Sequence, residues 1–163
     1  LGLYQPEKGD ITIGSVNVSA IPDHERRACI GCVEQHFSRV PGTVLEQITL
    51  SDPRITREMA EKAAQLAGID AAIRTLPEGY ATVCTDGMFS QGEWQLLSIA
   101  RAAAADPAVL LLDEITANPD AETESRVLEA LRQASRGRTV LSVSHRMYES
   151  LGGRIVEIVA PPQ

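Results

Sequence analysis

The stretch Val109-Leu110-Leu111-Leu112-Asp113-Glu114 decides the fold class that we predict for this chain. A run of apolar residues from Val109 to Leu112 predicts a strand buried on both faces, as in a parallel sheet covered by helices. The two acids that follow would stand at the carboxyl edge of that sheet, where α/β proteins bind their ligands. A plain strand followed by an acidic turn is the alternative, and the surrounding sequence has to decide between them.

Strand and helix signals alternate over most of the chain, which predicts an α/β fold with a largely parallel sheet. We expect strands or hairpins at 11–18, 28–34, 109–112, 139–143 and 154–159, with the segment 139–143 buried. We expect helices at 43–48, 56–67, 70–76, 92–105 and 121–135. The helices between 43 and 76 are not interrupted by strands. We therefore predict a sheet-containing core from 1–36 and 106–163, with a helical subdomain inserted at 37–105.

The composition narrows the functional classes. Acidic residues outnumber basic ones by 22 to 15, and the basic residues are scattered rather than gathered in the stripe that nucleic-acid binding needs. The sequence contains no apolar run of membrane-spanning length and no signal peptide at its start. A role at a membrane would then depend on a partner or on residues outside the 163 given.

A zinc site is suggested by the spacing of His24, Cys29, Cys32 and His36. We expect residues 28–33 to form a strand, in which positions three apart point to opposite faces. The two thiols would then not converge on one ion. With only three cysteines and no secretory signal, reduced thiols are the simpler interpretation.

Three further motifs carry chemistry. Ser90-Gln91-Gly92-Glu93 opens a predicted helix, where free N–H groups and a hydroxyl can bind an anion. The same spacing fits an ordinary capping box between Ser90 and Glu93, and both interpretations can hold together. His145 follows the predicted strand 139–143, a place where a histidine is more often structural than catalytic. Gln35 follows the predicted strand that ends at Glu34, and taken alone it is a polar strand end.

In this order and spacing, the motifs resemble those of the ABC ATPase family. The segment 113–120 resembles its Walker B motif and D-loop, Phe89-Ser90-Gln91-Gly92-Glu93 its signature, 139–146 its switch histidine, and 33–37 its Q-loop. The segment 76–83 resembles the stretch that precedes the signature in exporters, although Cys84-Thr85 stands where Gly-Glu is usual. The signature departs from Leu-Ser-Gly-Gly-Gln at Gln91 and Glu93, and a carboxylate near a phosphate is unfavourable unless it points away or is neutralised.

The resemblance implies a P-loop NTPase-like fold and a role for each motif residue. Asp113 would hold Mg²⁺ through water, Glu114 would act as the general base, and His145 and Gln35 would orient the attacking water, with Gln35 also near Mg²⁺. The nucleotide-binding residues of the signature and D-loop would be Ser90, Gln91, Gly92, Glu93 and Asp120. They would serve the ATP held by a second nucleotide-binding domain in a head-to-tail dimer.

No Gly-x-x-x-x-Gly-Lys-Ser/Thr loop occurs in the 163 residues, whose only lysines are Lys8 and Lys62. By the resemblance, the strands and Walker A loop that usually precede Leu1 are absent from the chain. Without that nest of N–H groups, the β- and γ-phosphates lose their main anchor. We expect the chain alone neither to bind nor to hydrolyse ATP appreciably.

The function implied is an ATPase domain of an exporter-type transporter, coupled to a transmembrane domain at the cytoplasmic face of a membrane. Two alternatives stay open: a catalytically impaired half of an asymmetric dimer, and a non-transport ABC protein in translation or DNA repair. The acidic composition argues against direct nucleic-acid binding in the latter.

Overall fold

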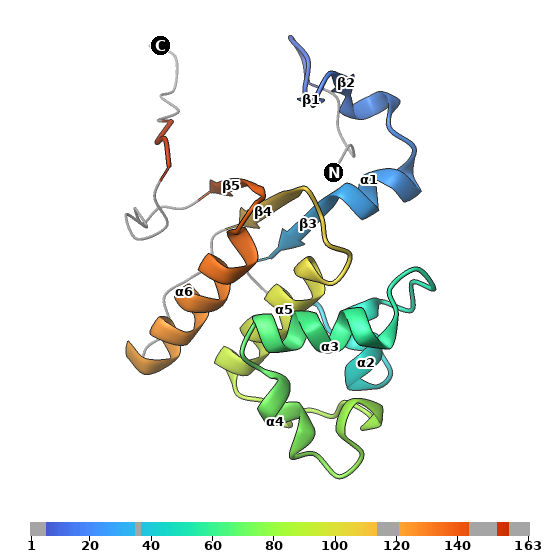
Figure 1. The fold of residues 1–163 in the computed structure, drawn as a ribbon, viewed down its shortest axis with the longest axis vertical. Coiled ribbons are helices and arrows are strands. Elements are labelled where there is room, and N and C mark those ends of the chain that lie inside the picture. The colour runs from blue at the N-terminus through green and yellow to red at the C-terminus, as the bar shows by residue number, and fades with distance from the viewer. Residues whose placement is uncertain (1–5, 35–36, 114–120, 144–152, 157–163) are drawn as a thin grey trace.

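A computed structural model describes residues 6–34, 37–113, 121–143 and 153–156. Its centre is a parallel sheet of strands β3 (Ile30–Val33), β4 (Val109–Asp113) and β5 (Thr139–Val143), in the order β3-β4-β5 (Figure 1). A separate antiparallel pair, β1 (Thr12–Ile13) and β2 (Val16–Asn17), leads into the short 3₁₀ helix η1 (Val18–Ala20). The α/β class and the hairpin within 11–18 are confirmed.

The helical cluster lies on one side of the sheet, between β3 and β4 in the sequence (Figure 1). It contains α2 (Val44–Thr49), α3 (Arg57–Leu66), α4 (Asp70–Arg74), the 3₁₀ helix η2 (Gly79–Ala81) and α5 (Gln91–Ala103). The four α-helices lie within or beside their predicted ranges, whereas no helix was predicted at η2. Side-chain caps at Thr43, Thr56 and Ser90 begin three of them, and Gly68 follows α3 in the left-handed conformation predicted there.

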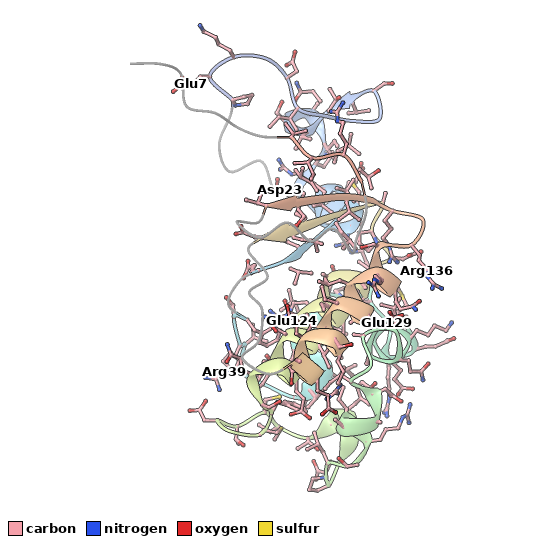
Figure 2. The ribbon with its side chains drawn as sticks, turned by 90° about the vertical axis from the view of Figure 1, so that its left-hand side faces the viewer. Glu7, Asp23, Arg39, Glu124, Glu129 and Arg136 are labelled. Carbon is pink, nitrogen blue, oxygen red and sulfur yellow. The ribbon has the colours of Figure 1, made fainter. Side chains whose placement is uncertain are left out.

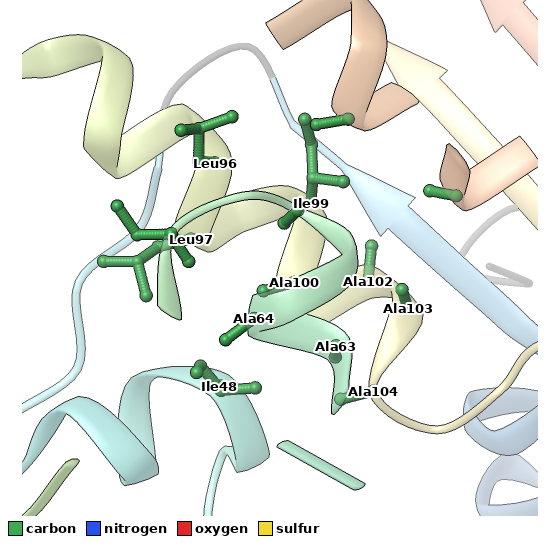
Figure 3. Close-up of a cluster of buried hydrophobic side chains, with 14 of the residues drawn as sticks. Ile48, Ala63, Ala64, Leu96, Leu97, Ile99, Ala100, Ala102, Ala103 and Ala104 are labelled. Carbon is green, nitrogen blue, oxygen red and sulfur yellow. The ribbon is translucent and has the colours of Figure 1, made fainter. Parts of the chain in front are cut away.

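Helix α5 is the centre of the packing. It contacts β3, α2, α3 and α6 (Ala121–Ser135), and its Leu96, Leu97, Ile99 and Ala100 are almost fully buried (Figure 3). Small residues of α3, among them Ala63 and Ala64, lie against this face of α5 and allow the two helices to approach closely (Figure 3). Helix α6 carries the exposed Glu129 on its outer side, and the exposed Arg136 follows the end of the helix (Figure 2).

The approach of α5 to β3 requires glycine at position 31. A Cβ there would stand 2.3 Å from the carbonyl oxygen of Ala102 and 2.8 Å from Cδ2 of Leu110. Both neighbours belong to the packed interior, so neither can move without disturbing the helix or β4. The close contact therefore fixes α5 against the sheet.

Three predictions about strands are wrong. The strand expected from residue 28 begins at Ile30, because α1 (Asp23–Cys29) continues through Cys29, whose thiol donates to the carbonyl of Glu25 at 2.9 Å. The strand 139–143 exists, but it is an edge strand rather than a buried one. Its Leu141 and Val143 are 61% and 58% exposed, because among the described elements β5 packs extensively only against β4 and no described helix covers it. The described part of the strand expected at 154–159, residues 154–156, is not a strand.

The helical position of Cys29 also changes the argument about zinc. Cys29 ends α1 while Cys32 lies in β3, so the two thiols belong to different elements. Within the described residues, no three His, Cys, Asp or Glu side chains are grouped so that they could hold a metal ion. His36 lies outside those residues.

Candidate active site

The three parallel strands end at one edge of the sheet. In the register, Val33 of β3 is opposite Leu112 of β4, and Asp113 at the end of β4 is opposite Val143 at the end of β5. The segments that follow the three strands therefore all begin at the same edge of the sheet. Among the described residues, Glu34 and Asp113 lie there with exposed side chains.

The negative charges of these two carboxylates act on the thiol of Cys32 in β3. Burial raises the pKa of the Cys32 thiol, and the negative charges of Glu34 and Asp113 raise it further. Both carboxylates thus contribute to a negative potential at the edge. Carboxylate oxygens are the ligands that hard cations such as Mg²⁺ prefer, so the donor set at this edge suits that ion.

Four of the predicted site residues lie outside the described part of the chain. These are Gln35, Glu114, Asp120 and His145. Gln35 directly follows Glu34, Glu114 directly follows Asp113, and His145 comes two positions after Val143. Their roles remain predictions.

The signature segment forms the capping box that its spacing predicts. The backbone N–H of Ser90 donates to Oε2 of Glu93 at 2.8 Å, and the N–H of Glu93 donates to Oγ of Ser90 at 3.3 Å. Glu93 therefore places its own carboxylate at the N-terminus of α5, where the helix dipole favours an anion. Gln91, the first residue of the helix, is exposed beside it. Among these described residues, no hydrogen bond or ion pair links Asp113 to the segment 90–93.

Gly92 has a packing role that sequence reasoning missed. A Cβ at this position would stand 2.2 Å from Cγ2 of Thr123, in the first turn of α6. The absent side chain lets the N-terminal turns of α5 and α6 meet. Nothing in the sequence near Gly92 indicates that Thr123, more than 30 positions away, is its neighbour.

A shallow groove of about 500 Å³ lies beside this end of α5. Two segments line the groove. One consists of Phe37 and residues 39–41, and the other of residues 84–86. Backbone hydrogen bonds hold them together, from Val44 N to Thr82 O and from Cys84 N to Gly42 O, each 2.9 Å long. An ion pair joins Arg39, which stands at the molecular surface, to Asp86 (Figure 2). The Q-loop-like segment and the segment before the signature thus form one surface.

The contact at Gly92 yields a stability test. We predict that Gly92→Ala lowers the free energy of unfolding by about 1–3 kcal/mol, because the new methyl group overlaps the Thr123 methyl. Adding Thr123→Ser removes that methyl, and the next Thr123 atoms are at ordinary contact distance, 3.5 and 3.6 Å. The double variant should therefore recover most of the loss in denaturant unfolding. A double variant as unstable as Gly92→Ala would contradict this assignment.

Comparison with known proteins identifies the family. A family model described as ABC transporter matches residues 1–117. The chain is 37% identical to P-glycoprotein 14 of Caenorhabditis elegans over 147 residues, which are 89% of this chain and 11% of that protein. It is 36% identical over 146 residues to the probable multidrug resistance ABC transporter ATP-binding/permease protein YheH of Bacillus subtilis, with 88% of this chain and 22% of the relative covered.

A third relative, the ABC multidrug transporter MDR2 of Trichophyton rubrum, is 40% identical over 149 residues, 88% of this chain and 11% of that protein. The chain thus spans less than a quarter of the length of each of these relatives. The matched region includes the strand edge at Asp113 and the capped signature at Ser90. The chain therefore belongs to the ABC transporter family, as part of its nucleotide-binding domain.

Proposed function

We propose that the chain is the ATP-hydrolysing part of an ABC transporter that exports its substrate. The observation that carries the proposal is the parallel register of β3, β4 and β5, which starts the segments bearing Gln35, Glu114 and His145 from one edge beside Asp113. The names of the relatives, a multidrug transporter and a multidrug resistance ATP-binding/permease protein, support a role in transport, and the exporter-like segment 76–83 is the reason for proposing export.

Each motif residue has a part in the proposed hydrolysis. Glu114 takes a proton from water while the water oxygen attacks the γ-phosphorus and the bond to the ADP oxygen breaks. Gln35 and His145 hold that water in line. Asp113 would hold Mg²⁺ through water, and the ion would neutralise charge on the phosphate oxygens. Ser90, Gln91, Gly92 and Asp120 bind the nucleotide of the opposing domain.

The 163 residues supply only part of the phosphate contacts. They contain no glycine-rich loop with a lysine to surround the β- and γ-phosphates. We propose that the chain alone does not bind ATP appreciably, and that hydrolysis belongs to the complete protein.

The proposed division into core and helical subdomain is supported by the order of elements. All three strands of the parallel sheet come from 1–36 and 106–163, and α2, α3 and α4 all come from 37–105. Helix α5 lies across the boundary, because Ala102 near its end packs on Gly31 of β3. Motion of the helical subdomain would then be transmitted to the sheet through α5.

The proposed partners are a second nucleotide-binding domain and a transmembrane domain. The groove is lined on one side by the segment after Gln35, which by the family resemblance faces the transmembrane domain, so we propose that contact at the groove. Among the described helices, none is long and apolar enough to cross a membrane. From the family resemblance, we propose that the chain lies at the cytoplasmic face of a membrane, held there by the transmembrane domain, and we propose no nucleic-acid partner.

One observation favours a second candidate, a catalytically impaired half of an asymmetric dimer. The capping box holds the Glu93 carboxylate at the N-terminus of α5, the helix end at which, by our proposal, the opposing nucleotide binds. Two anions at one helix end repel each other. The signature of this domain would then bind the nucleotide held by the partner domain weakly, although this domain keeps Glu114 and His145.

The general base provides the direct test of hydrolysis. In the complete protein, Glu114→Gln should lower kcat for ATP by about 100-fold or more, because an amide cannot accept the proton. Nucleotide binding should stay intact. The matched control is Glu122→Gln, at an exposed position of α6, which should leave both unchanged. Wild-type turnover in Glu114→Gln would refute the role of Glu114.

The second candidate is tested at Glu93. Glu93→Gln keeps the capping box but removes the charge. In the complete protein it should lower KM for ATP about fivefold, equivalent to ~1 kcal/mol of relieved repulsion. Glu46→Gln is the matched control, since Glu46 forms the same capping box with Thr43 on α2. An unchanged KM in Glu93→Gln would show that this carboxylate does not weaken nucleotide binding.

A further inference from the structure

Arg101 of α5 joins two distant segments through its guanidinium group. Its Nε donates to the carbonyl of Gln47 at 2.6 Å, and its Nη1 donates to the carbonyl of Ser38 at 2.9 Å. The guanidinium also lies over the ring of Phe37, 4.0 Å from its centroid. One side chain therefore holds both the end of α2 and the segment that follows Gln35.

Gln47 completes this attachment. Its side chain is fully buried and makes two hydrogen bonds to the backbone of Val40. The Val40 N–H donates to Oε1 at 3.1 Å, and Nε2 donates to the Val40 carbonyl at 2.6 Å. Because Arg101 binds the Gln47 carbonyl, the segment 37–40 is fixed at Ser38 directly and at Val40 through Gln47.

Aromatic stacking connects the same segment to the beginning of α5. Phe37 stacks on Trp94 with ring centroids 5.1 Å apart, and Trp94 meets Phe89 edge to face at 5.1 Å. Arg39 lies over the Trp94 ring at 5.5 Å. The contacts thus run from Arg101 through Phe37 to Trp94, which is only one position beyond the Ser90–Glu93 capping box.

The energetics make Arg101 hard to replace. Burial lowers its pKa to about 10, against the opposing effect of the Glu34 charge, so the guanidinium stays protonated near neutral pH. Arg101 is partly buried, and the carbonyls of Gln47 and Ser38 replace part of its lost hydration, while its Nη2 has no hydrogen-bond partner among the described residues. A planar group with several donors can bind two carbonyls and stack on a ring at once, and a lysine cannot do all three.

We infer that Arg101 is a positioning residue that fixes the Gln35 segment to the signature helix, so that the two parts of the site move as one unit. The inference rests on the proposed function. Arg101 acts through the backbone of 37–40, which begins two positions after Gln35, and through α5, which presents Ser90 at its N-terminus. Arg101 itself would not contact the nucleotide.

The test is a double-mutant cycle in the complete protein between Arg101→Met and Gln35→Ala. If Arg101 works by placing Gln35, Arg101→Met should lower kcat about 10- to 100-fold with little change in KM. It should add almost nothing to the loss in Gln35→Ala. Arg101→Lys should recover part of kcat. The control is Arg57→Met, which removes an exposed arginine of α3 paired with Glu61.

Hydrogen exchange provides a measurement that does not depend on activity. If Arg101→Met does not fold, Arg101→Lys provides a variant that keeps the charge. Exchange in the peptide covering 37–41 should rise in Arg101→Lys and stay unchanged in Arg57→Met. Additive kcat losses in the cycle, or unchanged exchange at 37–41, would overturn the inference. An inactive wild type, or an active Gln35→Ala with wild-type kcat, would instead count against the proposed function.

Discussion

The packing of α5 against β3 is the contact on which the rest of the structure depends. It requires glycine at position 31, where a Cβ would lie 2.3 Å from the Ala102 carbonyl. From this fixed end, α5 extends past α2, α3 and α6 to its capped N-terminus at Ser90. The sheet and the signature segment are therefore joined by one helix, and Arg101 of that helix binds the carbonyl of Ser38 beside it.

Charge distinguishes the two ends of this arrangement. The sheet edge has carboxylates that raise the pKa of Cys32 and suit a divalent cation. The N-terminus of α5 would ordinarily attract a phosphate, yet it already holds the carboxylate of Glu93. By our proposal, the same capping box that stabilises the helix would compete with the ligand, which would link local stability to nucleotide affinity.

Local patterns predicted the elements well, because caps and apolar runs act over a few residues. The capping box at Ser90, the strand that ends at Asp113 and the turn at Gly68 are examples. Long-range packing was not predictable. Leu141 and Val143 look like core residues in sequence, but burial depends on what covers the sheet face. Likewise, Arg101 is an ordinary helix residue by pattern, and only the fold brings it to Ser38 and Gln47. The motif residues Gln35, Glu114, Asp120 and His145 rest on the family resemblance.

The central claim is that the edge beside Asp113 binds the metal–nucleotide complex of this ABC protein. Electron paramagnetic resonance of Mn²⁺ bound to the complete protein with ATP tests it most directly. The account predicts that Asp113→Ala weakens Mn²⁺ binding about 10- to 100-fold, as expected for loss of a group that holds the ion through water. Asp86→Ala, in the groove, should leave it unchanged. Wild-type Mn²⁺ affinity in Asp113→Ala would contradict the account.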